Sequence, residues 1–492
     1  MIYTNPVIKG FYPDPSVCFA DGKYYLVTSS FQYFPGVPLF ESDDLINWNQ
    51  IGHVLTRESQ LPLGLALSSA GIFAPTIRYY NGTFYMVTTN TTTQKNFYVT
   101  TNDIHGEWSE PIFVEQDGID PSLYFENGHA YFMSNGTDDF GNNGVTQCEI
   151  DISTGAKLSE SRTIWQGSGG RYLESPHLYK IGDYYYIMSA EGGTEYGHMI
   201  TYARSNNLWG KYESYPENPV LTNRNLGGFM IQGVGHGDLI QKPDTKEWFI
   251  IHLGFRQIDK WLPFHHLGRE TFLTPVNFGC DGWFSVGNNG TTQEQYTVQG
   301  DFIQKEKHSY GFDDVNEWIY IRNPDMSKYV LTPEKYTLFG SEYTLDMTQC
   351  SPSFIGIRHK DFKCKVSCKV TSSDGESGLT VYMDENHHYD IAVVPDGSEG
   401  YEVIFRLHIG DAEYIKNRVS ISGNTAELKI SSDNYCYVFG IEENGSYKQL
   451  GSASTRYVST EVACGFTGVI FGLYAVGIGT EGNFSDFTMI NE

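Results

Sequence analysis

Apolar and polar residues alternate in short runs along most of the chain, and this spacing predicts β-strands rather than helices. In the first half, one phrase recurs five times: a turn-forming start, an apolar strand, a turn and an aromatic strand such as Tyr24-Tyr25-Leu26-Val27. The copies open with Asp14-Pro15-Ser16-Val17, Ala74-Pro75-Thr76-Ile77, Asp120-Pro121-Ser122-Leu123, Ser175-Pro176-His177-Leu178 and His236-Gly237-Asp238-Leu239. Such a repeat, with two strands and a turn per unit, is typical of a β-propeller with one copy per blade. We therefore expect five blades.

The rhythm changes after a polar stretch from Gln293 to His308 that has no strong pattern. From Tyr310 onward, short alternating strands are separated by Gly, Asn and Asp turns, and no helical segment is expected. This pattern predicts a second domain of the β-sandwich type, with a jelly-roll-like arrangement. The predicted fold is all-β: a five-bladed β-propeller over residues 1–296, a linker over 297–308 and a β-sandwich over 309–492.

Charge and composition limit the class of partner. The 59 acidic residues outnumber the 33 Lys and Arg, which gives a formal net charge of -26. Nucleic acid and membrane surfaces are bound chiefly through basic residues, so neither is an expected partner. Aromatic residues make up 15% of the chain, including 35 Tyr. Aromatic faces suit sugar-binding clefts, although strands favour Tyr and Phe for structural reasons alone.

Targeting signals and cysteine spacing indicate the compartment. The start of the chain has no basic segment followed by an apolar one, and no apolar run reaches about 18 residues. We therefore expect a cytoplasmic protein with reduced thiols. The eight cysteines are scattered. Cys364 and Cys368 alternate with polar residues and share a strand face with Val366, which indicates burial rather than half of a zinc site.

Three carboxylates occupy the same place in the repeat. Asp14 and Asp120 both precede the proline, and Glu174 lies one position before Ser175 in its own copy. In isolation each has an ordinary explanation, because Asp-Pro commonly starts a turn and a single Glu is usually solvated. In a propeller, however, equivalent positions of the blades meet at the central channel. Converging like charges disfavour the fold and are typical of sites where a cation or a reaction needs them.

Two carboxylates across a pocket can hydrolyse an acetal. One donates its proton to the leaving oxygen, the other deprotonates water, and a third negative charge raises the pKa of the donor. Glycosidases use this arrangement. The sequence therefore favours a glycoside hydrolase.

Seven segments, in order, also resemble glycoside hydrolase family 43, within it the two-domain β-xylosidase/α-L-arabinofuranosidase group. They are Asn5 to Ser16, Gly71 to Arg78, Gly118 to Leu123, Glu174 to Tyr179, Ala190 to His198, Gly235 to Leu239 and His266 to Thr271. The resemblance covers nearly the whole chain. It implies an exo-acting enzyme that releases single pentose units from an oligosaccharide with inversion, without a required cofactor.

The resemblance also implies roles for individual residues. Asp14 matches the general base, Glu174 the general acid, and Asp120 the carboxylate that tunes and orients the acid. Arg269 matches an arginine that binds sugar hydroxyls, a task suited to a rigid fork of donors. The alternative for Arg269 is a structural ion pair with the adjacent Glu270 or another acid.

The binding residues implied by the resemblance each have a structural alternative. His236 matches a channel histidine that in some relatives faces a hydrated calcium ion, but a single His at a strand start is often only hydrogen-bonded. Phe31 and Phe73 match walls of the sugar subsite, with core packing as the alternative. An aromatic side chain of the second domain closes the pocket in the family, and Phe466 is the candidate, followed by Phe471.

Three departures from the family pattern leave the pentose open. Ile119 precedes the central Asp where some relatives have Phe, Ser175 follows the acid where Gly is frequent, and Phe73 replaces a common Trp. These residues change the pocket walls, and discrimination between similar sugars can depend on roughly 1–3 kcal/mol of contact. Both xylopyranosyl and arabinofuranosyl groups therefore remain candidates.

Other functions are consistent with a propeller. A non-catalytic carbohydrate-binding propeller would not need all three acids, and a protein-interaction propeller would not need converging carboxylates. An endo-arabinanase-like hydrolase would have an open groove and usually lacks a large second domain. The sequence does not determine the oligomeric state; because relatives commonly associate, a homo-oligomer is one of the alternatives.

Overall fold

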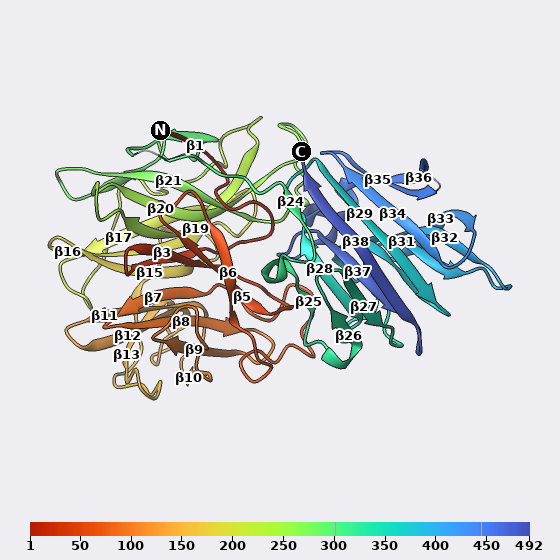
Figure 1. The fold of residues 1–492 in the computed structure, drawn as a ribbon. Coiled ribbons are helices and arrows are strands. Elements are labelled where there is room, and N and C mark those ends of the chain that lie inside the picture. Colours follow the sequence, from red (N-terminus) through yellow and green to blue (C-terminus); the bar gives the residue numbers. More distant parts are fainter. Residues whose placement is uncertain (301, 444) are drawn as a thin grey trace.

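The computed structural model describes residues 1–300, 302–443 and 445–492. The chain folds into two all-β domains that lie next to each other, one coloured red to green and the other green to blue (Figure 1). The prediction of a five-bladed propeller followed by a sandwich is confirmed.

Each propeller blade is a four-stranded antiparallel sheet whose strands follow one another in sequence order. Each copy of the repeated phrase forms the first two strands of a blade, and the first strands of the five blades contact each other around the channel. The blades are β2 (Ser16–Ala20), β3 (Lys23–Val27), β5 (Gly36–Ser42) and β6 (Asn49–Leu55); β7 (Thr76–Tyr80), β8 (Thr83–Asn90), β9 (Lys95–Thr101) and β10 (Ile112–Val114); β11 (Ile119–Glu126), β12 (His129–Thr137), β13 (Asn143–Ile150) and β14 (Arg162–Trp165); β15 (Glu174–Ile181), β16 (Tyr184–Glu191), β17 (Met199–Ser205) and β18 (Glu213–Ser214); β19 (Ile231–Gln241), β20 (Trp248–Arg256), β21 (Glu270–Phe278) and β22 (Phe284–Val286).

The ring closes between the last blade and the first. Leu26 and Val17 of the first blade share a buried apolar cluster with Phe249 and Leu273 of the last. In addition, β1 (Ile2–Thr4) pairs with β23 (Gln295–Thr297), which follows the last blade. Because burial of apolar surface is the dominant favourable contribution to folding, these contacts hold the five inner strands around one shared channel.

The second domain is a sandwich of two antiparallel sheets. Along β29 (Cys364–Ser373), buried residues alternate with exposed or half-buried ones, and Cys364 and Cys368 lie in the core as predicted. One sheet is β26 (Tyr329–Leu331), β27 (Lys335–Phe339), β38 (Glu481–Asn491), β29, β34 (Thr425–Ser432), β35 (Cys436–Glu443) and β36 (Ser446–Ser454), with β24 (Ser309–Tyr310) beside β38. The other is β28 (Ser353–Arg358), β37 (Ile470–Val476), β30 (Glu376–Asp384), β31 (His387–Pro395), β32 (Tyr401–Ile409) and β33 (Ala412–Ile421).

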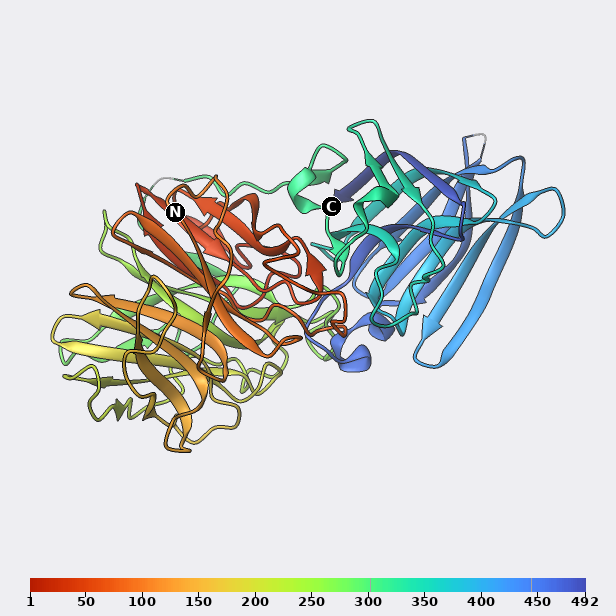
Figure 2. The same ribbon diagram turned by 90° about the horizontal axis from the view of Figure 1, so that it is seen from below.

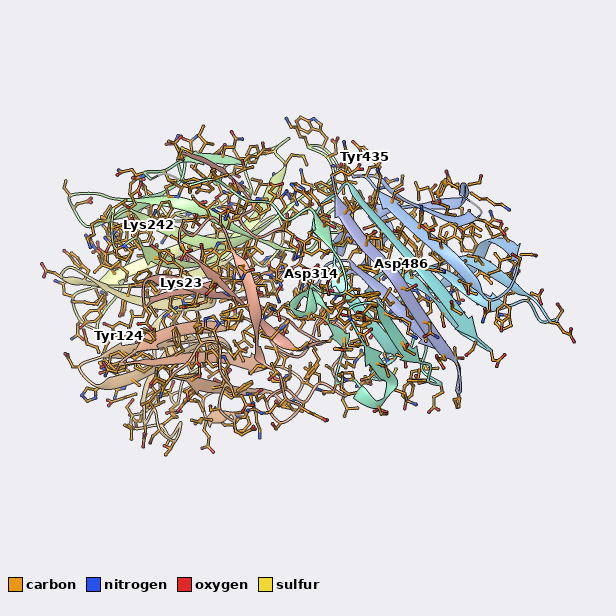
Figure 3. The ribbon with its side chains drawn as sticks, in the orientation of Figure 1. Lys23, Tyr124, Lys242, Asp314, Tyr435 and Asp486 are labelled. Carbon is orange, nitrogen blue, oxygen red and sulfur yellow. The ribbon has the colours of Figure 1, made fainter. Side chains whose placement is uncertain are left out.

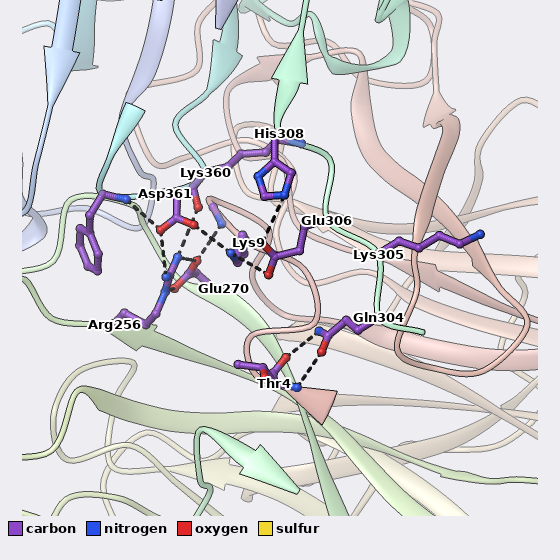
Figure 4. Close-up of polar contacts among 12 residues, drawn as sticks. Thr4, Lys9, Arg256, Glu270, Gln304, Lys305, Glu306, His308, Lys360 and Asp361 are labelled. Atoms are coloured by element: carbon purple, nitrogen blue, oxygen red, sulfur yellow. Dashed lines mark hydrogen bonds and ion pairs between the residues drawn. The ribbon is translucent and has the colours of Figure 1, made fainter. Parts of the chain in front are cut away.

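The connection between the domains runs from β23 to β24. Within the described part of residues 298–308 there is no strand or helix. The side chain of Gln304 bonds to the backbone of Thr4, accepting at 2.7 Å and donating at 2.8 Å (Figure 4). The linker limits 297–308 stay a prediction, because the strands mark only where pairing stops and resumes.

Backbone pairing and ion pairs join the two domains. β4 (Tyr33–Phe34) of the propeller pairs with β25 (Tyr320–Ile321), which follows the linker. Asp361 of the sandwich accepts hydrogen bonds from Lys9 at 2.8 Å and Arg256 at 3.2 Å (Figure 4). Tyr435, labelled at the sandwich edge in Figure 3, donates to Asp259 of the propeller at 2.9 Å. The propeller face is therefore covered on one side by the second domain.

The expectation of a second domain without helical segments was wrong. It contains η1 (Val315–Glu317), η2 (Met326–Lys328), η3 (Thr455–Val458) and α1 (Thr460–Ala463). In Figure 2 the blue coils of η3 and α1 lie between the two domains. A single helical turn is too short to produce a recognisable periodicity in the sequence. None of the helices in the described residues is long and apolar enough to span a bilayer.

Candidate active site

A cavity of about 570 Å³ opens where the inner strands of the propeller begin. Both domains contribute to its walls: inner-strand residues and blade loops on one side, and the segment after α1 on the other. The lining residues are Asp14, Phe31, Phe73, Ala74, Ile119, Asp120, Tyr172, Glu174, Gly193, Thr194, Glu195, Tyr196, His198, His236, His265, Arg269, Thr460, Glu461, Cys464, Gly465 and Phe466. All eight predicted site residues are among them.

One backbone feature turns the inner strands toward this cavity. The equivalent repeat positions Asp14, Asp120, Ser175 and His236 have φ angles of 56°, 52°, 56° and 48°. The left-handed region is uncommon for residues other than glycine, and it occurs here together with register shifts in three of the four strands. Such a kink re-aims the side chain at the strand start. The shared sequence position thus becomes a shared location in space.

Asp14 is buried and tightly held. Its Oδ1 accepts a hydrogen bond from Arg269 Nη1 at 2.9 Å, and its Oδ2 accepts one from Ser29 Oγ at 2.6 Å. Burial alone would raise the pKa of Asp14, but the charge of Arg269 and the Ser29 hydrogen bond favour the carboxylate and hold the pKa below its ordinary value. Asp14 is therefore ionised at neutral pH and can accept a proton.

Glu174 has the opposite electrostatic character. Burial, followed by the negative charge of Asp14, raises its pKa to about 7. No hydrogen bond to its carboxyl group is formed by any residue that the structure describes, which leaves this group free to meet a ligand. A carboxyl group with this pKa retains a proton near neutrality and can donate it.

Asp120 lies between these two acids in chain order and is also buried. Burial, then the charges of Glu174 and Asp14, raise its pKa well above the ordinary value, and the backbone N–H of Ser175 donates a hydrogen bond to it. That bond fixes the residue next to Glu174. Because each carboxylate disfavours ionisation of the other, Asp120 and Glu174 together hold a proton near neutral pH.

Arg269 is placed in the site rather than in a separate ion pair. Its Nη1 donates to Asp14 and also to Thr194 Oγ1 at 2.8 Å, while Nη2 lies 3.3 Å from the backbone oxygen of Phe466. The adjacent Glu270 instead pairs with Arg256, at 2.8 Å. The alternative of a Glu270 pair is therefore wrong, whereas an ion pair with another acid, Asp14, is present. Arg269 connects this ionised acid, a blade loop and the second domain.

Three aromatic rings form one wall of the cavity. Phe31, Phe73 and Phe466 contact one another with ring centroids 5.3–5.9 Å apart. Phe31 is also part of a buried cluster, so this residue both packs in the core and lines the cavity. Phe471, by contrast, is buried in the sandwich core. Of the two aromatic candidates of the second domain, only Phe466 reaches the cavity.

His236 lies beside two of the acids, with Nδ1 at 3.6 Å from Asp14 and 4.0 Å from Asp120. Burial lowers its pKa, so the imidazole is neutral near pH 7. Within the described residues, no group of three or more His, Cys, Asp or Glu side chains is placed to hold a metal ion. A channel cation beside His236 stays a prediction.

Comparison with known proteins agrees with this geometry. The model for glycosyl hydrolases family 43 matches residues 3–284, and the model for the beta xylosidase C-terminal concanavalin A-like domain matches residues 315–491. The chain belongs to glycosyl hydrolases family 43.

Two relatives illustrate the range of this family. The chain is 40% identical over 511 residues to the non-reducing end alpha-L-arabinofuranosidase BoGH43B of Bacteroides ovatus, covering 99% of this chain and 93% of the relative. It is 35% identical over 530 residues to a xylosidase/arabinosidase of Butyrivibrio fibrisolvens, covering 99% and 98%.

Solved structures show the same two-domain arrangement. The Bacteroides ovatus xyloglucan PUL GH43B superposes with a TM-score of 0.92 at 38% identity over 99% of both chains. The xylan beta-1,4-xylosidase of Bacillus halodurans C-125 superposes with a TM-score of 0.91 at 28% identity, over 99% of this chain and 100% of that one.

The departures noted in this family 43 chain fall into two groups. Ile119 and Phe73 line the cavity, where they can contact a sugar. Ser175 is buried and keeps the left-handed backbone that glycine would adopt without strain. Two of the three departures therefore act on the shape of the pocket.

Sequence reasoning assigned no role to several residues of this family 43 site. Glu461, from α1, accepts hydrogen bonds from Tyr196 at 2.9 Å and from the His265 backbone at 2.9 Å, and it pairs with the His265 ring at 2.6 Å. Thr194 and Tyr196 lie in one of the segments that carried the family resemblance, and that segment was the available signal. Glu461 had none, because a single helical turn in a distant domain brings it to the cavity.

Proposed function

We propose that this protein is an inverting exo-glycoside hydrolase that releases single pentose units from xylo-oligosaccharides or arabinoxylan fragments. The activity is that of a β-1,4-xylosidase, an α-L-arabinofuranosidase, or both. The observation that carries the proposal is the opposite pKa shift of two acids in one cavity: Asp14 is held ionised, and Glu174 is raised to about 7. An acid and a base with separated pKa values are what hydrolysis of an acetal requires.

In the proposed reaction, Asp14 takes a proton from a water molecule as that water attacks the anomeric carbon. Glu174 gives its proton to the departing glycosidic oxygen, so the bond from that oxygen to the anomeric carbon breaks as the new one forms. Asp120 accepts a hydrogen bond from the backbone N–H next to Glu174, and the two acids together hold a proton near neutral pH. Arg269 orients Asp14 and offers donors to sugar hydroxyls.

The shape of the cavity supports attack at a chain end. The segment of the second domain that carries Glu461 and Phe466 forms one wall, so the site is a pocket bounded by two domains. An open groove, as an endo-arabinanase-like enzyme needs, is not consistent with that wall. The name of BoGH43B, which is similar over nearly the whole chain, also specifies action at the non-reducing end.

The pentose can be decided by one comparison of rates. The relatives are named for arabinofuranosyl and xylosyl groups, and Phe73 and Ile119 alter the walls that would discriminate between them. The measurement is kcat/KM with an aryl β-xyloside and an aryl α-L-arabinofuranoside. Chain-length analysis of products from a linear oligosaccharide distinguishes single-unit release from internal cleavage.

The proposal is tested with variants of the two acids. Asp14→Ala is expected to lose nearly all turnover on every substrate while remaining folded, because it removes the ionised carboxylate that activates the water. Glu174→Ala should lose turnover on natural substrates but keep part of it with very good leaving groups, which need no proton. Proton NMR should show the inverted anomer as the first product. An Asp14→Ala enzyme that still hydrolyses, or a protein that binds an oligosaccharide without cutting it, contradicts the proposal.

A further inference from the structure

Tyr172 presents an aromatic ring to the catalytic cavity from an unusual position. It lines the cavity two residues before Glu174, and 61% of its surface is exposed. No hydrogen bond to its hydroxyl group is formed by the residues that the structure describes. A scattered surface tyrosine needs no explanation, but this ring lies at the mouth of the site.

The backbone of Tyr172 is held in a strained conformation. Its φ angle is 53°, in the left-handed region that disfavours a bulky side chain. The neighbouring Arg171 is bound to Gly192 through both its backbone and its side chain: its backbone oxygen accepts from Gly192 N–H at 2.7 Å, and its Nε donates to the Gly192 oxygen at 2.9 Å. Strain of this kind persists only where the surroundings impose it, and it is typical of binding and catalytic sites.

The loop between β16 and β17 of the same blade packs closely against the ring. A Cβ atom on Gly193 would lie 3.1 Å from Cδ2 of Tyr172, and the φ angle of Gly193 is 80°. Glycine therefore lets the loop approach the ring closely. The guanidinium of Arg171 lies 5.2 Å from the ring centroid, a cation–π arrangement that further fixes the ring. The ring is thus pre-positioned and still largely exposed.

The location of the ring relative to the acid indicates its use, and this step rests on the proposed function. Glu174 would protonate the oxygen of the departing group, so that group must lie on the Glu174 side of the cavity. We infer that Tyr172 is the platform on which the first sugar of the departing oligosaccharide packs, and that it sets the preference for sugar over small leaving groups. The apolar C–H face of a sugar packs well on an aromatic ring that also has a polar edge.

The conformation of Tyr172 suggests a variant that should fold. Tyr172→Gly removes the ring and replaces it with the residue that adopts a φ angle of 53° most readily. Tyr172→Phe retains the platform. Tyr447→Ala is the matched control, since Tyr447 is 50% exposed on β36 of the sandwich and does not line the cavity.

The test compares two substrates that share the pentose which the wild type prefers: its disaccharide and its glycosyl fluoride. Fluoride offers no ring to Tyr172, so the ratio of kcat/KM for the disaccharide to that for the fluoride isolates the platform. We expect this ratio to fall about tenfold in Tyr172→Gly. In Tyr172→Phe and Tyr447→Ala, the ratio of the two kcat/KM values should stay within about twofold of the wild-type ratio.

The outcomes separate this inference from the proposed function. An unchanged ratio in Tyr172→Gly, or an equal fall in Tyr447→Ala, overturns the role of Tyr172 while hydrolysis by the wild type still supports the proposed function. A wild type that cleaves neither substrate overturns the proposed function itself. Should Tyr172→Gly not fold, as judged by its thermal transition, Tyr172→Asn gives the same comparison, because Asn also tolerates the left-handed region.

Discussion

Phe466 of the sandwich domain stacks on Phe31 of the propeller, with ring centroids 5.8 Å apart and an interplanar angle of 28°. The guanidinium carbon of Arg269 lies 5.5 Å from the centroid of Phe466 and 5.6 Å from that of Phe31. The same guanidinium holds Asp14 at 2.9 Å. The second domain therefore helps to position the residue that fixes the proposed base.

Removal of the Phe466 ring should weaken substrate binding. Phe466→Ala takes one ring from the aromatic wall and leaves the acids in place, so we expect KM to rise about tenfold with a smaller change in kcat. The thermal transition should fall by only a few degrees, because the ring is half-buried. Steady-state kinetics on a pentoside checks this. A kcat that falls as much as KM rises would instead show that the ring supports the transition state.

The rate should depend on pH through Asp14 and Glu174. Asp14 must be ionised, and its pKa lies below the ordinary value, so activity should remain high into the acidic range. Glu174 must be protonated, and its pKa is about 7, so kcat/KM should fall as the pH rises through about 7.

The control for this profile is Glu174→Gln with a dinitrophenyl glycoside, whose leaving group needs no proton. The fall near pH 7 should be absent in that variant. If the alkaline limb persists unchanged, a different group titrates and the assignment of Glu174 is contradicted.

The raised pKa of Glu174 also has a consequence for stability. Between its ordinary value of 4.5 and about 7, the folded state holds a proton that the unfolded state has released, so stability falls as the pH rises across this window. Glu174→Gln removes the ionisable group and should be more stable than the wild type at pH 8, by on the order of 2 kcal/mol. At pH 4 the two proteins should differ little.

Thermal denaturation at the two pH values checks this stability difference. Glu195→Gln is the matched control, because Glu195 lines the same cavity but its side chain is 68% exposed. An equal gain in Glu195→Gln would mean that net charge, rather than burial of Glu174, causes the effect.

Arg269→Lys should show how much the two-pronged hydrogen bond from Arg269 to Asp14 contributes beyond the positive charge itself. A lysine retains the charge but cannot form the two-pronged contact with Asp14. We expect kcat/KM to fall about 100-fold. The pKa of Asp14 should move up toward its ordinary value, so the acidic limb of the pH profile shifts to higher pH. If kcat/KM falls but the acidic limb of the pH profile does not shift, Arg269 acts only by binding the sugar and does not lower the pKa of Asp14.

Much of the fold could be predicted from local pattern. The repeated phrase marks the inner strand of every blade because each blade has the same short-range chemistry: a turn start, an apolar strand and an aromatic strand. Alternation likewise predicted the buried face of β29 at Cys364 and Cys368. The single turn of α1 was not predictable, since four residues carry no period.

The site was predictable where it follows the repeat, and not where it depends on docking of the domains. Asp14, Asp120 and Glu174 converge because the blades are equivalent. Tyr172 lies outside the repeat, and its exposure depends on a strained loop backbone. Glu461 enters the cavity only because the sandwich packs against the propeller, and contacts between segments about two hundred residues apart leave no local signal.

The pairing of β4 with β25 makes the two domains one unit for protein engineering. Tyr33 of β4 is two residues from Phe31, so a chain cut at the linker would leave an unpaired edge strand beside the aromatic wall. Any chimera that grafts a foreign second domain onto this propeller must therefore carry over the short strand around Tyr320 as well as the Phe466 loop. The segment needed for a complete site therefore extends beyond the five blades into the second domain.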